Sequence, residues 1–234
     1  MDGFSWNLLL AAAGIALTHT LLGPDHYLPF ILLSRARGWS ARRTTAITAI
    51  CGVGHVASSL LLGAIGLALG VAVGRLEGLE GSRGSLAAWA LVAFGVAYAA
   101  WGVRRAVRRS RGIEPHEHGG HIHLHSRGDK PHQHGGAGVG SSTTFWALLV
   151  IFVLGPCEPL IPLFVLPASR GRWGAAALTA VVFGVITIIT MVGVTLLGSA
   201  GLSPVRLGAL ARWDHAIAGG IIAITGLAVV FLGL

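Results

Sequence analysis

Two histidines and an aspartate lie near the start of the chain, inside an otherwise apolar stretch. His19 and His26 are seven residues apart, close to two turns of helix, so a helix would carry both on one face. Asp25 has no Lys or Arg nearby in sequence, and an unpaired charge in lipid costs from about 2.5 kcal/mol upward. Imidazole with carboxylate suits Ni, Co, Zn or Fe in the divalent state better than Mg or Ca. The pattern therefore predicts a site for a divalent transition-metal ion.

A second acidic residue in an apolar stretch, Glu158, directly follows Cys157. The segments 22–26 and 154–158 both begin Leu-Gly-Pro, which aligns Asp25 with Cys157. Each segment is followed by an apolar run that contains proline. We therefore expect Glu158 to add negative charge to the same site and Cys157 to add a soft ligand.

A third histidine, His55, lies on the next apolar segment. Cys51 is one helical turn before His55, and Ser58 and Ser59 follow it at positions i+3 and i+4. These residues form a polar stripe on an apolar helix, which should face the site. We predict that His55 supplies a third imidazole and that Cys51 packs as a small apolar residue.

The composition indicates the elements that must position these residues. Hydrophobic residues make up 53% and charged residues 11% of the 234, and the mean hydropathy is +0.73, which excludes a soluble globule. A bilayer core needs about 20 apolar residues in helix. Six segments qualify: 5–33, 44–73, 86–103, 144–168, 174–198 and 214–233. We therefore predict an all-α, multi-pass membrane protein with six transmembrane helices.

The two halves of this arrangement resemble each other. Gly23-Pro24 and Gly155-Pro156 lie inside the first and fourth apolar segments, and proline there removes a backbone donor and breaks the helix. With three helices each, the halves would enter the membrane from opposite faces. Many transporters have such inverted repeats, with their sites at the midplane where broken helices meet. The predicted units are a first repeat (1–110), a loop (111–140) and a second repeat (141–234).

The net charge of +8 is explained by topology. Thirteen of the seventeen Lys and Arg residues lie in the first, third and fifth connections, and the positive-inside rule places that side in the cytoplasm. Both termini are then expected outside. We expect the lipid bilayer and no nucleic acid as a partner.

The 111–140 segment contains little apolar sequence and seven of the eleven histidines. Such a composition chelates divalent metals without needing a fold. We interpret it as a flexible cytoplasmic loop that collects metal. Its histidines are His116, His118, His121, His123, His125, His132 and His134.

At these residues the chain resembles the nickel/cobalt transporter superfamily. Members carry H-x-x-x-x-D-H in an early helix, and the hydrogenase- and urease-associated nickel permeases carry H-P-x-x-G-x-D-H. The segment His19-Thr20-Leu21-Leu22-Gly23-Pro24-Asp25-His26 is similar to the second form, with Thr20 at the position of its first proline. Gly54-His55 with Ser58 is similar to the superfamily's Gly-His-Ser segment. The loop is similar to that of the nickel/cobalt efflux branch.

A second resemblance indicates another function. The segment Gly155-Pro156-Cys157-Glu158-Pro159 is similar to the Pro-Cys segment of membrane thiol-disulfide conduits of cytochrome c maturation. Those proteins place one cysteine in each half at equivalent positions. Here Asp25 is aligned with Cys157, so an electron conduit would have to pair Cys51 with Cys157.

We therefore expect a transporter of divalent metal, nickel or cobalt before zinc or iron, and not an enzyme. The resemblance implies a midplane site built by His19, Asp25, His26 and His55, to which the residue chemistry adds Cys157 and Glu158. The metal is the cargo, and no organic cofactor is expected. Efflux is favoured over uptake because a cytoplasmic loop gathers metal where an exporter needs it. Protons are the coupling ion we hypothesise, since protonation of ligands opposes metal binding.

Overall fold

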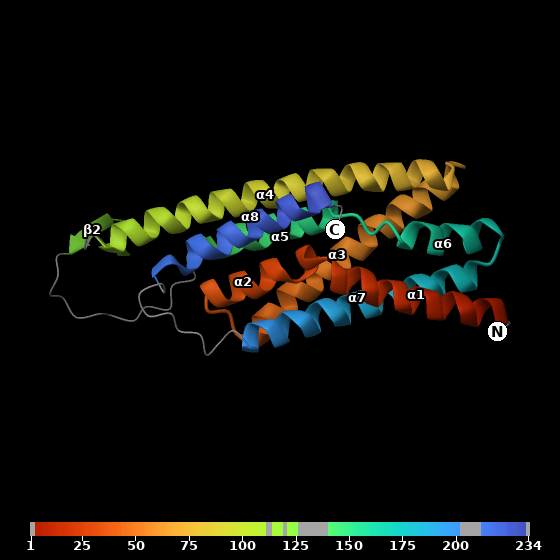
Figure 1. Ribbon diagram of the computed structural model, residues 1–234, viewed down its shortest axis with the longest axis horizontal. Coiled ribbons are helices and arrows are strands. Elements are labelled where there is room, and N and C mark those ends of the chain that lie inside the picture. The colour runs from red at the N-terminus through yellow and green to blue at the C-terminus, as the bar shows by residue number, and fades with distance from the viewer. Residues whose placement is uncertain (1–2, 111–113, 119–120, 126–139, 202–211, 233–234) are drawn as a thin grey trace.

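The computed structural model describes residues 3–110, 114–118, 121–125, 140–201 and 212–232. These residues form an elongated bundle in which most helices run along the long axis (Figure 1). The helices are α1 (Gly3–Leu22), α2 (Leu28–Ala36), α3 (Ala41–Ala68), α4 (Val73–Ser110), α5 (Gly140–Leu154), α6 (Leu160–Ser169), α7 (Trp173–Gly201) and α8 (Asp214–Leu232). The prediction of a mainly helical chain is confirmed.

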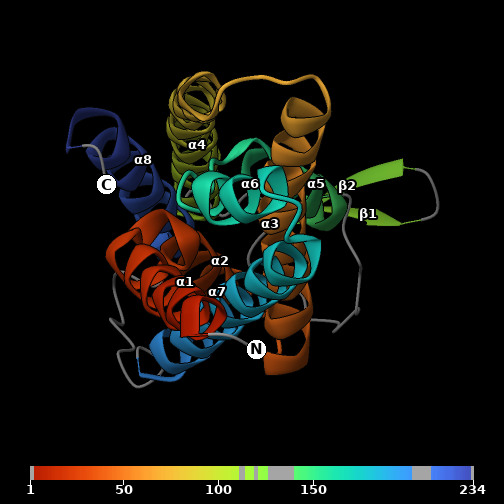
Figure 2. The same ribbon diagram turned by 90° about the vertical axis from the view of Figure 1, so that its right-hand side faces the viewer.

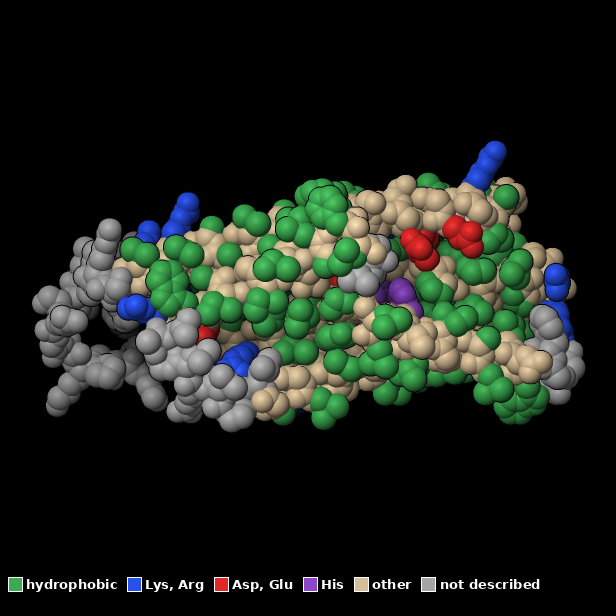
Figure 3. Space-filling view, in the orientation of Figure 1, with side chains coloured by type: hydrophobic (Ala, Val, Ile, Leu, Met, Phe, Trp, Pro, Cys, Tyr) green, Lys and Arg blue, Asp and Glu red, His purple; other side chains and the backbone are tan. Residues whose placement is uncertain are grey.

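Four helices of the described chain, α3, α4, α7 and α8, are long and apolar enough to cross a membrane. The bent pair α1 and α2 gives a fifth span if it is counted as one, whereas α5 and α6 are shorter apolar helices. Large hydrophobic side chains are exposed along the bundle, and Figure 3 shows them on much of its middle, with Lys and Arg toward the ends. Such a surface is consistent with a multi-pass membrane protein. Six spans remain a prediction.

The first apolar segment is broken at its Gly-Pro pair. α1 ends at Leu22, a single 3₁₀ turn covers Pro24–His26, and α2 begins at Leu28. The two arms are bent by 83°. Pro24 has no N–H to continue the ladder, and the Tyr27 hydroxyl donates to the Leu21 carbonyl at 3.2 Å. That carbonyl would accept from Asp25 in a continuous helix.

The fourth apolar segment is broken in the same way. α5 ends at Leu154, and α6 begins at Leu160. The Gly155 N–H still donates to the Ile151 carbonyl at 2.8 Å, whereas Pro156 has no N–H to donate. Helical bonding resumes where Leu160 donates to the Cys157 carbonyl at 2.9 Å. Both breaks therefore follow from the local sequence, as predicted.

Glycine sets the closest helix packing, between α4 and α8. A Cβ added to Gly219 would lie 2.7 Å from Ala99 Cα, and one added to Gly95 would lie 2.8 Å from Ala223 Cα. Neither position leaves room for a side chain, so the two backbones are in direct contact. Small residues at intervals of three or four are the usual device for such crossings in lipid. Figure 2 shows α8 beside α4, and α3, α6 and α7 grouped across the bundle.

The bounds differ from prediction at two places. α4 runs from Val73 to Ser110, so the charged stretches 74–85 and 104–110, both expected in connections, belong to a helix. Within the predicted loop, β1 (Glu114–His118) and β2 (His121–His125) pair in antiparallel fashion. Their register sets His116 opposite His123 and His118 opposite His121. Strand pairing was not expected there, because the sequence has little apolar content. His132 and His134 lie outside the described residues.

Candidate metal site

Three histidines from three helical elements converge on one cavity. His19 is in the last turn of α1, His26 ends the 3₁₀ turn after the first break, and His55 lies in α3. Together with Asp25 they line a cavity of about 300 Å³. Gly23 of the first break and Gly155 and Pro156 of the second break line the same cavity. The two broken helices therefore meet at this point.

The three imidazole rings are in mutual contact range. The ring centroid of His26 is 4.8 Å from that of His19 and 5.0 Å from that of His55, and it lies edge-on to both. His19 and His55 are nearly parallel, with an angle of 13° and a centroid separation of 6.5 Å. His26 and His55 are buried, at 4% and 3% exposure. In each of the three rings Nε2 is buried and has no hydrogen-bond partner among the described residues.

Asp25 fixes the orientation of His26. Its Oδ1 is 3.1 Å from His26 Nδ1, and the Gly23 carbonyl is 3.2 Å from the same nitrogen. Both partners are acceptors, so Nδ1 carries the proton and the Nε2 lone pair is left for a ligand bond. Gly23 is required here, because an added Cβ would lie 2.9 Å from Asp25 Oδ1. A carboxylate that orients a histidine in this way is the usual support of a metal-binding imidazole.

Cys157 completes a set of three donors. Its Sγ and one nitrogen each of His19 and His55 all lie within 4.8 Å of one another. In tetrahedral coordination, bonds of about 2.1 Å to nitrogen and 2.3 Å to sulfur place two ligands of one ion about 3.6 Å apart. Donors up to 4.8 Å apart would therefore have to move about an ångström closer to bind a single ion. Two nitrogens and a sulfur form a donor set of borderline softness, which suits divalent transition metals.

Glu158 lies elsewhere. Its side chain is exposed and is not among the described residues that line the cavity. A Cβ added to Gly81 of α4 would be 3.5 Å from Glu158 Oε1, so the carboxylate lies on the α4 side of the second break. Cys51 packs in a hydrophobic cluster with Leu33 and Met191, as expected. The structure brings together five of the six predicted site residues and leaves Glu158 outside.

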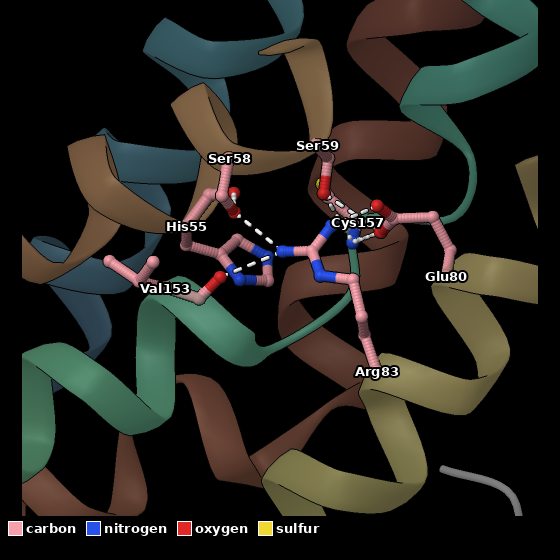
Figure 4. Close-up of polar contacts among 7 residues, drawn as sticks. All are labelled: His55, Ser58, Ser59, Glu80, Arg83, Val153 and Cys157. Atoms are coloured by element: carbon pink, nitrogen blue, oxygen red, sulfur yellow. Dashed lines mark hydrogen bonds and ion pairs between the residues drawn. The ribbon is translucent and has the colours of Figure 1, made fainter. Parts of the chain in front are cut away.

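Sequence analysis missed a fully buried acid, Glu80 on α4. Its carboxylate pairs with Arg83 and accepts a hydrogen bond from the Ser59 hydroxyl at 2.8 Å. Arg83 also donates to Ser58 Oγ at 2.8 Å and to the Val153 carbonyl at 2.7 Å (Figure 4). The serine stripe of α3 therefore binds this ion pair rather than lining the cavity. A detectable signal was the spacing of Leu76, Glu80, Arg83 and Ala87, which follows one helix face.

The cavity is large enough for a partly hydrated ion, since about ten waters at 30 Å³ each would fill it. Its walls supply imidazole nitrogens and one carboxylate, and most of the other residues that line it are apolar. Three unpartnered imidazole nitrogens in such a place are costly unless a ligand binds them. No family model, curated protein or solved structure matches the chain. The functional argument therefore depends on the geometry and the donor chemistry.

Proposed function

We propose that this protein transports a divalent transition-metal ion, nickel or cobalt, across a membrane. The observation that carries the proposal is the convergence of three buried, unpartnered Nε2 atoms, from His19, His26 and His55, on one cavity. A packing histidine ordinarily finds a hydrogen-bond partner for each buried nitrogen. An ion bound among them would give these nitrogens a partner. The donors that already lie within 4.8 Å of one another are those of His19, His55 and Cys157, and the ring of His26 lies beside both histidines.

The distribution of charge supports a cation as the ligand. Glu80 is neutralised by Arg83. Among the described residues the ion pair of Asp25 is with His26 alone, and that histidine is neutral when its Nε2 is free to bind metal. Asp25 therefore keeps a net negative charge in an apolar setting, which a bound cation offsets.

The packing of the elements supports an inverted repeat of three plus three helices. If α1 and α2 correspond to α5 and α6, and α3 and α4 to α7 and α8, several of the contacts between elements have counterparts. α1 packs on α7 as α5 packs on α3, and α2 packs on α8 as α6 packs on α4. The site between the two breaks then lies near the middle of six spans, where transporters of this architecture bind substrate.

We propose efflux as the direction. The positive-inside rule places the histidine-rich loop in the cytoplasm, with both termini outside. The backbone register of β1 and β2 sets histidine positions opposite one another, which supports metal collection by this loop. Collection on the cytoplasmic side favours an exporter.

The energy source we propose is a proton gradient. Ligand nitrogens and the thiol must lose their protons to bind metal, so protonation releases it. Asp25 is the carrier we propose, since its charge is otherwise offset by the ion. Metal flux in vesicles that ignores an imposed pH gradient would contradict this coupling.

Cell-associated metal tests the proposal. We expect cells that produce the protein to hold less nickel or cobalt than cells that produce the His26→Ala variant at equal membrane abundance. Higher content would indicate uptake. Equal nickel, cobalt and zinc content in both would contradict metal transport.

A further inference from the structure

The second helix break separates two partners of one expected backbone hydrogen bond. In a continuous helix the N–H of Cys157 would donate to the carbonyl of Val153. Here that N–H donates instead to Glu80 Oε2 at 3.0 Å and to Ser59 Oγ at 3.1 Å. The Val153 carbonyl accepts instead from Arg83 at 2.7 Å. Each half of the broken bond therefore has a partner on the same ion pair of α4.

We infer that Glu80 and Arg83 are positioning residues that replace this backbone bond and thereby hold Cys157 Sγ beside His19 and His55. The inference rests on the proposed function, because it assigns the pair to the metal site. We call Glu80, Arg83 and Ser59 the brace of the second break. Its charged groups are matched, so it adds no net charge next to a cation.

The burial of the brace fits this role. Glu80 is 0% exposed and the Arg83 side chain is 22% exposed. Burying an ion pair is costly, and hydrophobic residues of similar volume often stabilise a protein as well or better. General stability therefore does not explain the pair. Capping two backbone groups that the Gly-Pro break leaves open does explain it, since each would otherwise be unsatisfied in an apolar setting.

Residues next to the brace connect it to His55 on α3 and to the second break. Ser58, which accepts from Arg83, donates to the carbonyl of His55 at 2.9 Å. On α4 a Cβ added to Gly84 would lie 2.8 Å from Pro156 Cγ, so the helix is packed directly against the break. Loss of the pair would leave the Gly-Pro segment without its hydrogen bonds to α4. Cys157 would then lose its fixed position.

The first break lacks a comparable ion pair among the described residues. There the Leu21 carbonyl accepts from the Tyr27 hydroxyl, and Asp25, the residue aligned with Cys157, contacts His26 directly. At the first break the carboxylate of Asp25 therefore lies within the site. At the second break the carboxylate of Glu80, on α4, accepts a backbone hydrogen bond instead.

Absorption spectra with Co²⁺ test the brace. In full-length protein carrying Cys51→Ser, Cys157 is the one thiol, because the chain has two cysteines. We expect bound Co²⁺ to give visible d–d bands together with a near-ultraviolet thiolate charge-transfer band. Glu80→Ala should retain the d–d bands and lose about nine-tenths of the charge-transfer band, as expected for a supporting group of a metal ligand.

Two further variants keep the test independent of folding. Glu80→Ala leaves Arg83 unpaired, so Glu80→Ala with Arg83→Ala removes both charges, and it should lose the band equally. Glu77→Ala, on an exposed position of α4, is the matched control and should keep both bands. A charge-transfer band of wild-type strength in the double variant would overturn the inference. The inference would also be overturned if the Cys51→Ser protein with an intact brace gave d–d bands but no charge-transfer band, because Cys157 would then not be a ligand.

A metal-free measurement separates this inference from the proposed function. Alkylation of the buried Cys157 by a maleimide should be about tenfold faster in Glu80→Ala than in the Glu77→Ala control, because the break opens more often. Faster alkylation in Glu80→Ala than in Glu77→Ala, with no Co²⁺ binding by the wild-type site, would support the brace and contradict the proposed metal function. If the wild-type site binds Co²⁺ but Glu80→Ala leaves both the alkylation rate and the charge-transfer band unchanged, the brace is contradicted and the metal function is not.

Discussion

His19 and His55 come from different helices, yet their imidazole rings lie almost parallel, with centroids 6.5 Å apart and His26 edge-on to both. None of the three Nε2 atoms has a hydrogen-bond partner among the described residues. A binding site and a packing cluster would respond differently to substitution of these histidines. Substituting a packing residue lowers stability, whereas substituting an unsatisfied ligand lowers binding.

Replacing His19, His26 or His55 by alanine, one at a time, should weaken Ni²⁺ binding about a hundredfold, or about 2.8 kcal/mol. For His19→Ala and His55→Ala the melting temperature of the metal-free protein should change by less than about 4 °C, because each removes an unsatisfied buried nitrogen. His26→Ala also removes the partner of Asp25 and should lower the melting temperature further. Calorimetric titration and thermal unfolding in detergent measure the two effects. A large loss of stability with intact binding would indicate packing instead.

Metal should stabilise the wild-type protein. At a Ni²⁺ concentration a hundred times the dissociation constant the gain is about 2.7 kcal/mol, and a chelator should reverse it. Because protons compete with metal for the imidazole nitrogens and the thiol, the gain should shrink as the pH falls. Thermal unfolding with and without Ni²⁺ across pH measures it. A gain that grows toward acid pH would contradict a histidine site.

Gly219→Val should destabilise the fold by about 1–3 kcal/mol, the usual cost of overpacking. The added Cβ would meet the Ala99 backbone of α4. Gly220→Val is the matched control, since a Cβ there has no heavy atom within 4 Å. Denaturation of both variants in the same detergent gives the comparison. Equal stabilities would show that the contact between α4 and α8 is not as close as described.

Deleting residues 115–134 should make the transporter respond less well to low metal concentrations without abolishing transport, because we place the loop outside the membrane path. Flux in vesicles should be retained at saturating metal, with a higher metal concentration needed for half-maximal rate. Full loss of flux in a well-inserted deletion protein would mean that the loop is part of the path.

The two cysteines separate metal transport from thiol-disulfide exchange. Both are free and buried, in different hydrophobic clusters. Protein with Cys51→Ser and Cys157→Ser should still transport metal with weaker affinity, since a conduit needs both sulfurs and a histidine site does not. If that protein were inactive while His19→Ala stayed active, the electron-conduit alternative would replace the metal account.

The site was predictable where local chemistry dictates structure. Proline next to glycine breaks a helix whatever surrounds it, so both breaks could be placed from sequence, and His19 and His26 follow from helical spacing. Glu158 could not be placed, because it lies in the irregular segment after Pro156, where helical periodicity does not set direction. Glu80 was missed because its charged surroundings resemble a connection. Its burial depends on partners from α3 and from the second break.

Nickel flux in proteoliposomes tests the central claim most directly. Wild-type protein and the His26→Ala variant are reconstituted at equal density, and entry of Ni²⁺ is followed with an enclosed metal-sensitive dye. The account predicts saturable flux for the wild type and loss of about nine-tenths or more of it for His26→Ala, since the variant lacks a central ligand. Wild-type flux from His26→Ala liposomes would contradict the account.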